Sequence, residues 1–222
     1  MNKSVIIEAR NVVKIYADGQ VRALDGISLQ VFAGEILVLR GPSGCGKSTL
    51  MHLLGGLDTP TSGKILFNGL PILDVCRVKG FRVRNIGFVF QAFYLWQNLN
   101  VLENVMLPLA ELSMSHKERR NRVEEIIDVV GISDKLKASV KNLSMGQRQR
   151  VALARALVAR PAVVFADEPT GSLDSKNTEN ILQLFRRINK ERQVTIAMVT
   201  HENFLSEYYD RQVEILDGKV RT

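Results

Sequence analysis

The chain has 222 residues, 45% hydrophobic and 24% charged, an ordinary balance for one folded domain with a sizeable core. It has no run of about 18 apolar residues that could span a bilayer, and Glu8 and Arg10 interrupt the start where a signal peptide needs an apolar stretch. Cys45 and Cys76 form no C-x-x-C pair, so we expect neither a disulfide framework nor a zinc site, and a reducing cytoplasm is the natural compartment.

The first part of the chain predicts short strands and a glycine-rich turn. The segment 35–40 is almost continuously apolar, as in a strand that is buried on both faces of a parallel sheet. It leads into a glycine-rich stretch over 41–46, and a helical run follows from Lys47. Further strands are expected at 4–7, 26–32 and 86–90, the last ending at Gln91.

Between about residues 100 and 160 the apolar spacing becomes helical, with repeats over 123–130 and 151–158. Strand and helix patterns then alternate to the end of the chain, with strands at 162–166, 194–199 and 212–216 and a helix around 181–188. This order predicts an α/β core with a mostly parallel sheet, interrupted by an inserted helical subdomain.

One motif points directly to nucleotide binding. The stretch 41–48 matches the G-x-x-x-x-G-K-[ST] phosphate loop. Glycines allow successive backbone N–H groups to point at phosphate oxygens, and the following helix adds its positive N-terminal end. Lys47 is expected to reach the β- and γ-phosphates, and the Ser48 hydroxyl to ligate Mg²⁺. The loop residues are Gly41, Pro42, Ser43, Gly44, Cys45, Gly46, Lys47 and Ser48.

Two adjacent carboxylates follow the apolar strand at 162–166. Ligands of open α/β sheets lie beyond the carboxyl ends of the strands, where Asp167 and Glu168 are expected. Asp167 is a candidate Mg²⁺ ligand, and Glu168 is a candidate base that polarises an attacking water. Alone, such a pair would more often be a solvated loop, but beside a phosphate loop it completes a hydrolytic site.

The stretch 143–150, Leu-Ser-Met-Gly-Gln-Arg-Gln-Arg, resembles the signature of ATP-binding cassette (ABC) ATPases. Met145 stands where the usual signature has a second glycine. The resemblance covers essentially the whole chain, and it implies a P-loop NTPase core over 1–91 and 160–222, an antiparallel β-subdomain at the N-terminus, and a helical signature subdomain over 92–159.

The resemblance also implies roles for residues outside the phosphate loop. Tyr16 corresponds to the aromatic that stacks on adenine, and His201 to the switch histidine at the γ-phosphate. Gln91 corresponds to a catalytic glutamine that senses Mg²⁺ and the membrane partner, and it is expected at the metal with Ser48 and Asp167. The remaining residues implied in ATP binding are Thr49, Ser144, Gly146, Gln147 and Asp174, the last in the D-loop 171–174. Ser144 has a structural role in any case, as the N-cap of the helix that begins near Gly146.

In this family two copies pair head to tail around two ATP molecules and drive a separate permease. The resemblance therefore implies a homodimer that is bound peripherally at the cytoplasmic face of the membrane. The stretches 88–91, 103–109 and 166–171 resemble exporters and extractors of macrolides, lipoproteins and haem. Docking of the permease is expected at Gln91 and the segment 92–96, although each of its aromatics could equally belong to the core.

Two other function classes remain as alternatives. The net charge of +7 would suit an ABC-type ATPase that acts on nucleic acid or ribosomes. The chain has no room for the coiled coil of repair ATPases and only one cassette, so no nucleic acid is expected. A regulatory module without turnover is the second alternative, and the presence of Lys47, Asp167, Glu168 and His201 argues against it.

Overall fold

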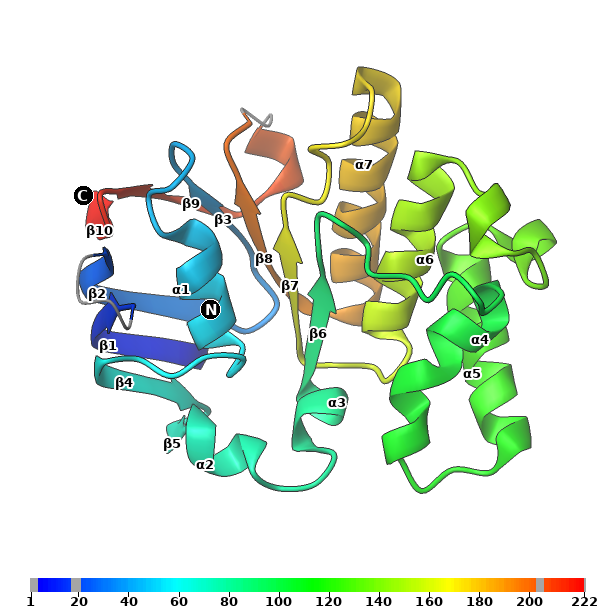
Figure 1. The fold of residues 1–222 in the computed structure, drawn as a ribbon, viewed down its shortest axis with the longest axis horizontal. Helices are drawn as coiled ribbons and strands as arrows, with labels where there is room; N and C mark the ends of the chain where they lie inside the picture. The colour runs from blue at the N-terminus through cyan, green and yellow to red at the C-terminus, as the bar shows by residue number, and fades with distance from the viewer. Residues whose placement is uncertain (1–3, 17–20, 203–205, 222) are drawn as a thin grey trace.

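The computed structural model describes residues 4–16, 21–202 and 206–221 and contains two sheets (Figure 1). The first sheet is antiparallel, with the strand order β2-β1-β4-β5. β1 continues well beyond the predicted strand at 4–7, through register shifts around Asn11, whose φ is 47°. The strands are β1 (Val5–Ile15), β2 (Arg22–Phe32), β4 (Ser62–Phe67) and β5 (Leu70–Pro71).

The second sheet has the order β10-β9-β3-β8-β7-β6, and all neighbouring strands except β9 and β10 run parallel. The strands are β3 (Ile36–Arg40), β6 (Ile86–Val89), β7 (Val163–Asp167), β8 (Thr195–Thr200), β9 (Arg211–Leu216) and β10 (Lys219–Arg221). The predicted mostly parallel α/β sheet and the antiparallel N-terminal sheet are thereby confirmed.

The continuous apolar pattern of β3 is explained by the two hydrophobic clusters. Leu37 and Leu39 belong to the cluster that α1 (Lys47–Leu54) forms between the two sheets, whereas Ile36 and Val38 belong to the cluster on the opposite face. Figure 1 shows α1 between the sheets and α7 on the other side of the second sheet. Since β3 is buried on both faces, each of these four apolar side chains favours folding, by about 25 cal/mol per Å² of apolar area removed from water.

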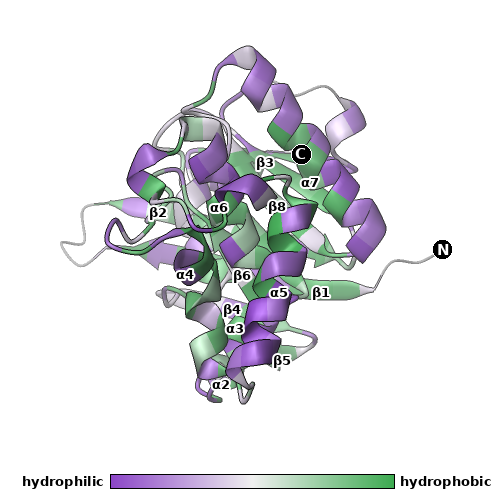
Figure 2. Cartoon of the chain, turned by 90° about the vertical axis from the view of Figure 1, so that its right-hand side faces the viewer, coloured by the Kyte–Doolittle hydropathy of each residue, from purple (hydrophilic) through white to green (hydrophobic). Residues whose placement is uncertain are grey.

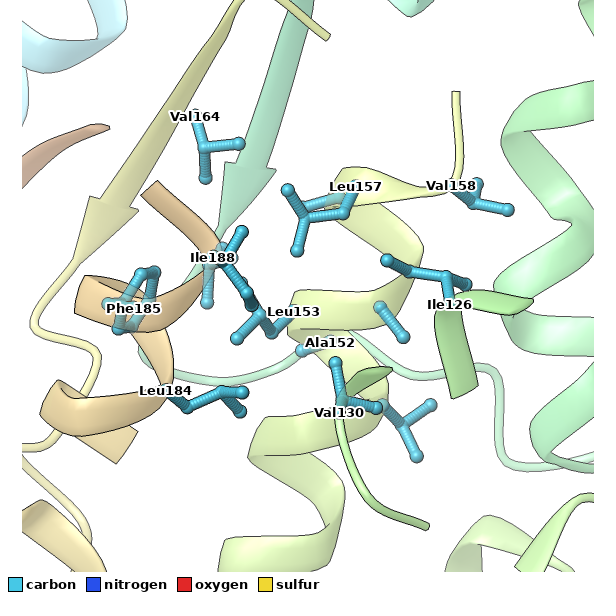
Figure 3. Close-up of a cluster of buried hydrophobic side chains, with 14 of the residues drawn as sticks. Ile126, Val130, Ala152, Leu153, Leu157, Val158, Val164, Leu184, Phe185 and Ile188 are labelled. Carbon is cyan, nitrogen blue, oxygen red and sulfur yellow. The ribbon is translucent and has the colours of Figure 1, made fainter. Parts of the chain in front are cut away.

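Helices gather on the far side of the second sheet, where α5, α6 and α7 pack around a common core (Figure 3). Ile126 and Val130 from the α5 region, Leu153 and Leu157 from α6, and Phe185 from α7 meet there. α5 stands on the outside of the molecule and turns a largely hydrophilic face outward (Figure 2). The helices are α2 (Ile72–Cys76), α3 (Phe81–Asn85), α4 (Val101–Met106), α5 (His116–Val129), α6 (Met145–Leu157) and α7 (Ser175–Arg192).

Short 3-10 turns complete the chain at Leu107–Glu111, Ser133–Lys135, Val140–Asn142 and Ser206–Tyr208. Within the described ranges, no helix is long and apolar enough to cross a membrane. The predicted division of the chain at 91/92 and 159/160 stays a prediction, although the helices α4, α5 and α6 all lie within 92–159.

Candidate nucleotide-binding site

The parallel register brings three predicted segments to one edge of the second sheet. Arg40 at the end of β3 lies opposite Thr200 at the end of β8, and Asp167 at the end of β7 lies opposite Val199. The phosphate loop follows Arg40 directly, and His201 follows Thr200. The loop, the two carboxylates and the histidine therefore share the edge at which parallel sheets bind their ligands.

Close approach of the backbone explains the glycines of the phosphate loop. A Cβ on Gly41 would collide with the carbonyl oxygen of Ile215, and one on Gly46 would collide with that of Ala23. Gly46 also has a φ of 99°, a conformation that L side chains rarely adopt, and it is the N-cap of α1. The Lys47 side chain is buried, and its Nζ donates to the carbonyl oxygens of Gly41 (2.9 Å) and Pro42 (2.7 Å). The ammonium group therefore lies inside the loop.

Ser48 and Asp167, the two predicted Mg²⁺ ligands from the loop and from β7, are in contact. The Ser48 hydroxyl donates to Oδ1 of Asp167 at 3.0 Å. Burial raises the pKa of Asp167, and the neighbouring charge of Glu168 adds to this effect, while the Ser48 hydrogen bond opposes it. A hydroxyl and a carboxylate suit Mg²⁺, a hard cation that uses few protein ligands alongside phosphate oxygens and water. The donor set therefore fits the predicted metal.

Glu168 and His201 form a second contact, with 2.9 Å between Oε1 of Glu168 and Nδ1 of His201. Glu168 has a φ of 43°, unusual for a residue with a Cβ, and its N–H donates to the carbonyl oxygen of Val199 on β8. A Cβ built on Gly171 would lie 3.3 Å from Oε2 of Glu168 and 3.6 Å from Nε2 of Gln91. The predicted base, the switch histidine and the glutamine thus surround one small volume.

Tyr16 and Thr49, the predicted residues for the nucleoside end, also lie side by side. The Tyr16 hydroxyl is 3.2 Å from Oγ1 of Thr49, and the ammonium of Lys14 lies 5.1 Å from the centre of the Tyr16 ring. The Tyr16 side chain is 44% exposed, so one ring face can accept another aromatic group. Its role in adenine stacking stays a prediction.

The signature residues form a separate unit at the start of α6. The Ser144 hydroxyl accepts from the Gln147 N–H, and the Gln147 side chain accepts from the Ser144 N–H, so the predicted N-cap is a full capping box. A Cβ on Gly146 would lie 3.2 Å from Oδ1 of Asn177, whose own N–H donates to the N-cap Asp174 of α7. Asn177 therefore lies next to both the signature and the D-loop residue Asp174, an arrangement that no motif in the sequence indicates.

The sequence matches the family model described as ABC transporter over residues 24–171. The chain belongs to the ABC transporter family. An Aquifex aeolicus protein named as the ATP-binding protein LolD of a lipoprotein-releasing system is 44% identical, over 97% of this chain and 96% of that protein.

Solved cassettes have the same fold. The dimeric bacterial ABC transporter cassette MJ0796 matches with a TM-score of 0.88 and 38% identity, over 98% of this chain and 97% of that one. The protein cbiO1 of Clostridium perfringens, part of the ABC transporter complex cbiONQ, matches with a TM-score of 0.90 and 32% identity, over 99% of this chain and 88% of that one. The chain is therefore an ABC cassette, an ATP-binding subunit whose enzymatic class is that of an ATPase.

Proposed function

We propose that this cassette hydrolyses ATP at the phosphate-loop edge of its second sheet, as a homodimer that drives a separate permease at the cytoplasmic face of the membrane. The observation that supports this best is the meeting of two pairs, Ser48 with Asp167 and Glu168 with His201, at the edge that carries the phosphate loop. A metal-ligand pair beside a base and its orienting group is what phosphoryl transfer to water requires.

Each residue has a definable task in that reaction. The backbone N–H groups of 43–48 and the Lys47 ammonium bind the phosphates of ATP. Ser48 and Asp167 would hold Mg²⁺, which when bound would supply positive charge against the phosphate oxygens. Glu168 accepts a proton from the water that attacks the γ-phosphorus, the bond to the leaving ADP oxygen breaks, and phosphate is formed. His201 orients Glu168 through the 2.9 Å contact.

The second half of the proposed ATP site comes from another copy of the chain. A serine hydroxyl has one donor and two acceptor positions, so Ser144 can accept from Gln147 and still donate to a γ-phosphate. The positive N-terminal end of α6 favours the same anion. The MJ0796 cassette has been solved as a dimer, and also as a dimer bound to ADP and Pi, which supports pairing of two copies here.

A groove beside Gln91 is the proposed docking surface for the permease. It has a volume of about 620 Å³ and lies between β6, the segment 76–83 and α6. Its wall includes Phe88, Phe90 and Tyr94, and Tyr94 is 65% exposed. Exposed aromatics in a concave surface are typical anchors for a partner. The relatives named LolD are ATP-binding proteins of lipoprotein-releasing systems, so we propose export or extraction of a hydrophobic or amphipathic cargo, of the lipoprotein, macrolide or haem type.

The structure corrects one part of the docking prediction. Not all side chains of 92–96 face outward: Leu95 is only 8% exposed and belongs to the helical core, and Phe93 packs partly against that core. Tyr94 and Trp96, each 65% exposed, are the large side chains of this segment that are available to a partner.

ATP-dependent dimerisation of the Glu168→Gln variant tests the proposal. The amide cannot accept the proton of the attacking water, so this variant should bind ATP, scarcely hydrolyse it and run as a dimer on size exclusion only with Mg-ATP. Lys47→Ala is the matched control, because it removes a phosphate ligand and should stay monomeric. A Glu168→Gln protein that stays monomeric at high concentration with Mg-ATP would refute the sandwich.

A further inference from the structure

Arg155, on α6, joins that helix to the loop that follows β6 and contains Gln91. Its Nη1 donates to the carbonyl oxygen of Tyr94 and its Nη2 to that of Phe93, both at 2.6 Å. Burial lowers the pKa of Arg155. A half-buried guanidinium normally pairs with a carboxylate, but here both bonds go to successive backbone carbonyls. Removing a guanidinium from water without a carboxylate partner costs free energy, so the position of Arg155 needs an explanation beyond packing.

The loop that Arg155 holds has an unusual backbone. Phe93 and Tyr94 have φ values of 58° and 45°, two consecutive left-handed residues that both carry a Cβ. Isolated left-handed residues of this kind are uncommon, and bulky side chains disfavour the conformation. The Phe93 N–H donates to the Phe90 carbonyl and the Tyr94 N–H to that of Ala92, which closes a tight turn around Gln91. The planar fork of the arginine matches the two carbonyls that this turn presents.

The base from which Arg155 reaches the loop is rigid. Gly87 on β6 lies so close to the backbone of Ala156 that a Cβ there would collide with its carbonyl oxygen. The strand β6 and the helix α6 are therefore fixed against each other at the residue next to Arg155, and Gln91 follows β6 by two residues. The two hydrogen bonds of the guanidinium therefore tie the segment that follows β6, with Gln91 in it, back to α6.

We propose that Arg155 is a positioning residue that sets the place of Gln91 in the hydrolytic site, by holding residues 93 and 94 in the left-handed turn. This inference rests on the proposed function, with Gln91 in the role that the family resemblance implies, a catalytic glutamine that senses Mg²⁺ and the membrane partner. Arg155 and Tyr94 also line the docking groove, and α6 begins with the signature residue Met145. A partner that displaces Tyr94 therefore acts on Gln91 and on the signature helix through the same guanidinium.

Steady-state ATPase kinetics of Arg155→Met and Arg155→Lys, in the full chain, test the proposal together with acrylamide quenching of Trp96. Trp96 is the only tryptophan and lies two residues beyond the held turn. We expect Arg155→Met to lower kcat about tenfold or more with little change in KM for ATP, and to alter the quenching. Arg155→Lys keeps the charge and part of the hydrogen bonding, so it should give an intermediate kcat and serve if the Met variant does not fold.

The matched control is Arg119→Met, because Arg119 also donates to a backbone carbonyl, that of Leu112, but within the helical segment away from Gln91. It should leave kcat and quenching near wild type. Adding Tyr94→Asn to Arg155→Met should restore part of kcat, since asparagine tolerates the left-handed conformation better than tyrosine.

Three results would overturn the inference: wild-type kcat and quenching in Arg155→Met, an equal loss in Arg119→Met, or no recovery in the double variant. Gln91→Ala separates the two proposals. If it retains wild-type kcat, the proposed role of Gln91 fails. If it loses activity while Arg155→Met does not, only the role of Arg155 fails.

Discussion

Adding one methyl group at Gly171 should slow hydrolysis without harming the fold. The Cβ of Gly171→Ala would lie 3.3 Å from Oε2 of Glu168 and 3.6 Å from Nε2 of Gln91. The shorter distance is tighter than an ordinary contact, and it is the Glu168 carboxylate that has to move. Because the other oxygen of this carboxylate contacts Nδ1 of His201 at 2.9 Å, a shift of a few tenths of an ångström also disturbs the pair.

The size of the effect follows from how sensitive catalysis is to placement. A misplacement of about 1 Å costs roughly 10²-fold in rate, so a few tenths of an ångström should lower kcat about three- to tenfold, or about 0.7 to 1.4 kcal/mol in the barrier. Stability should not fall, because Gly171 is exposed and its φ is outside the left-handed region. Replacing such a glycine by alanine instead stabilises by about 0.4 to 1 kcal/mol.

ATPase assays and thermal unfolding, run on the same preparations, check this pair of effects. Ser172→Ala, at the exposed neighbouring position, is the control and should retain wild-type kcat and unfolding temperature. Wild-type turnover in Gly171→Ala would contradict this expectation. A drop of its unfolding temperature along with kcat would also contradict it, since activity would then follow global stability rather than the position of the Glu168 carboxylate.

Three further expectations concern single side chains. Met145→Gly should change turnover in an ATPase assay less than tenfold. Met145 is the first residue of α6 and 43% exposed, and a glycine in a helix lowers stability by at most about 1 kcal/mol. An inactive wild type whose activity is restored by Met145→Gly would contradict this. Asp167→Asn should abolish ATPase activity yet raise the unfolding temperature. The pKa of Asp167 is higher in the folded than in the unfolded state, so the wild-type free energy of unfolding falls as pH rises between these two pKa values. The higher unfolding temperature of Asp167→Asn should therefore appear above this pH range and vanish in acid, which thermal melts across pH would show. Leu95→Asp should lower the free energy of unfolding by about 3 to 5 kcal/mol because Leu95 is buried. Trp96→Asp should unfold at the wild-type temperature and lose only co-purification with the permease. Equal unfolding temperatures of the two variants would contradict a buried Leu95 beside an exposed Trp96.

The strands of the second sheet could be predicted from the sequence because their burial on both faces leaves an uninterrupted apolar run. β3 and β7 are the clearest cases, and their predicted bounds differ from the observed ones by at most one residue at each end. β4 and the C-terminal part of β1 were missed, since β4 is exposed over Ser62–Lys64 and β1 is interrupted by a left-handed Asn11. A half-exposed strand without apolar alternation and a bulge both remove the period-2 pattern on which strand prediction depends.

The motif residues could be placed on the correct sheet edge, but their mutual contacts could not. Parallel strands bring their carboxyl ends together whatever the details, so the grouping of Asp167 with the phosphate loop follows from topology alone. The 2.9 Å contact of Glu168 with His201 depends on the φ of 43° at Glu168. A glutamate in the sequence does not indicate this left-handed conformation. The burial of Leu95 beside an exposed Trp96 likewise depends on a turn formed by two left-handed residues.

The three α-helices between 100 and 157 all begin in the same way. Asn100 with Glu103, Ser115 with Glu118, and Ser144 with Gln147 form capping boxes at the starts of α4, α5 and α6. Each box satisfies two backbone donors that would otherwise fray first. These helices should therefore move as rigid units, with first turns that stay helical when a partner exerts force on them. Bending would then be concentrated in the connections between them, where amide hydrogen exchange should be fastest.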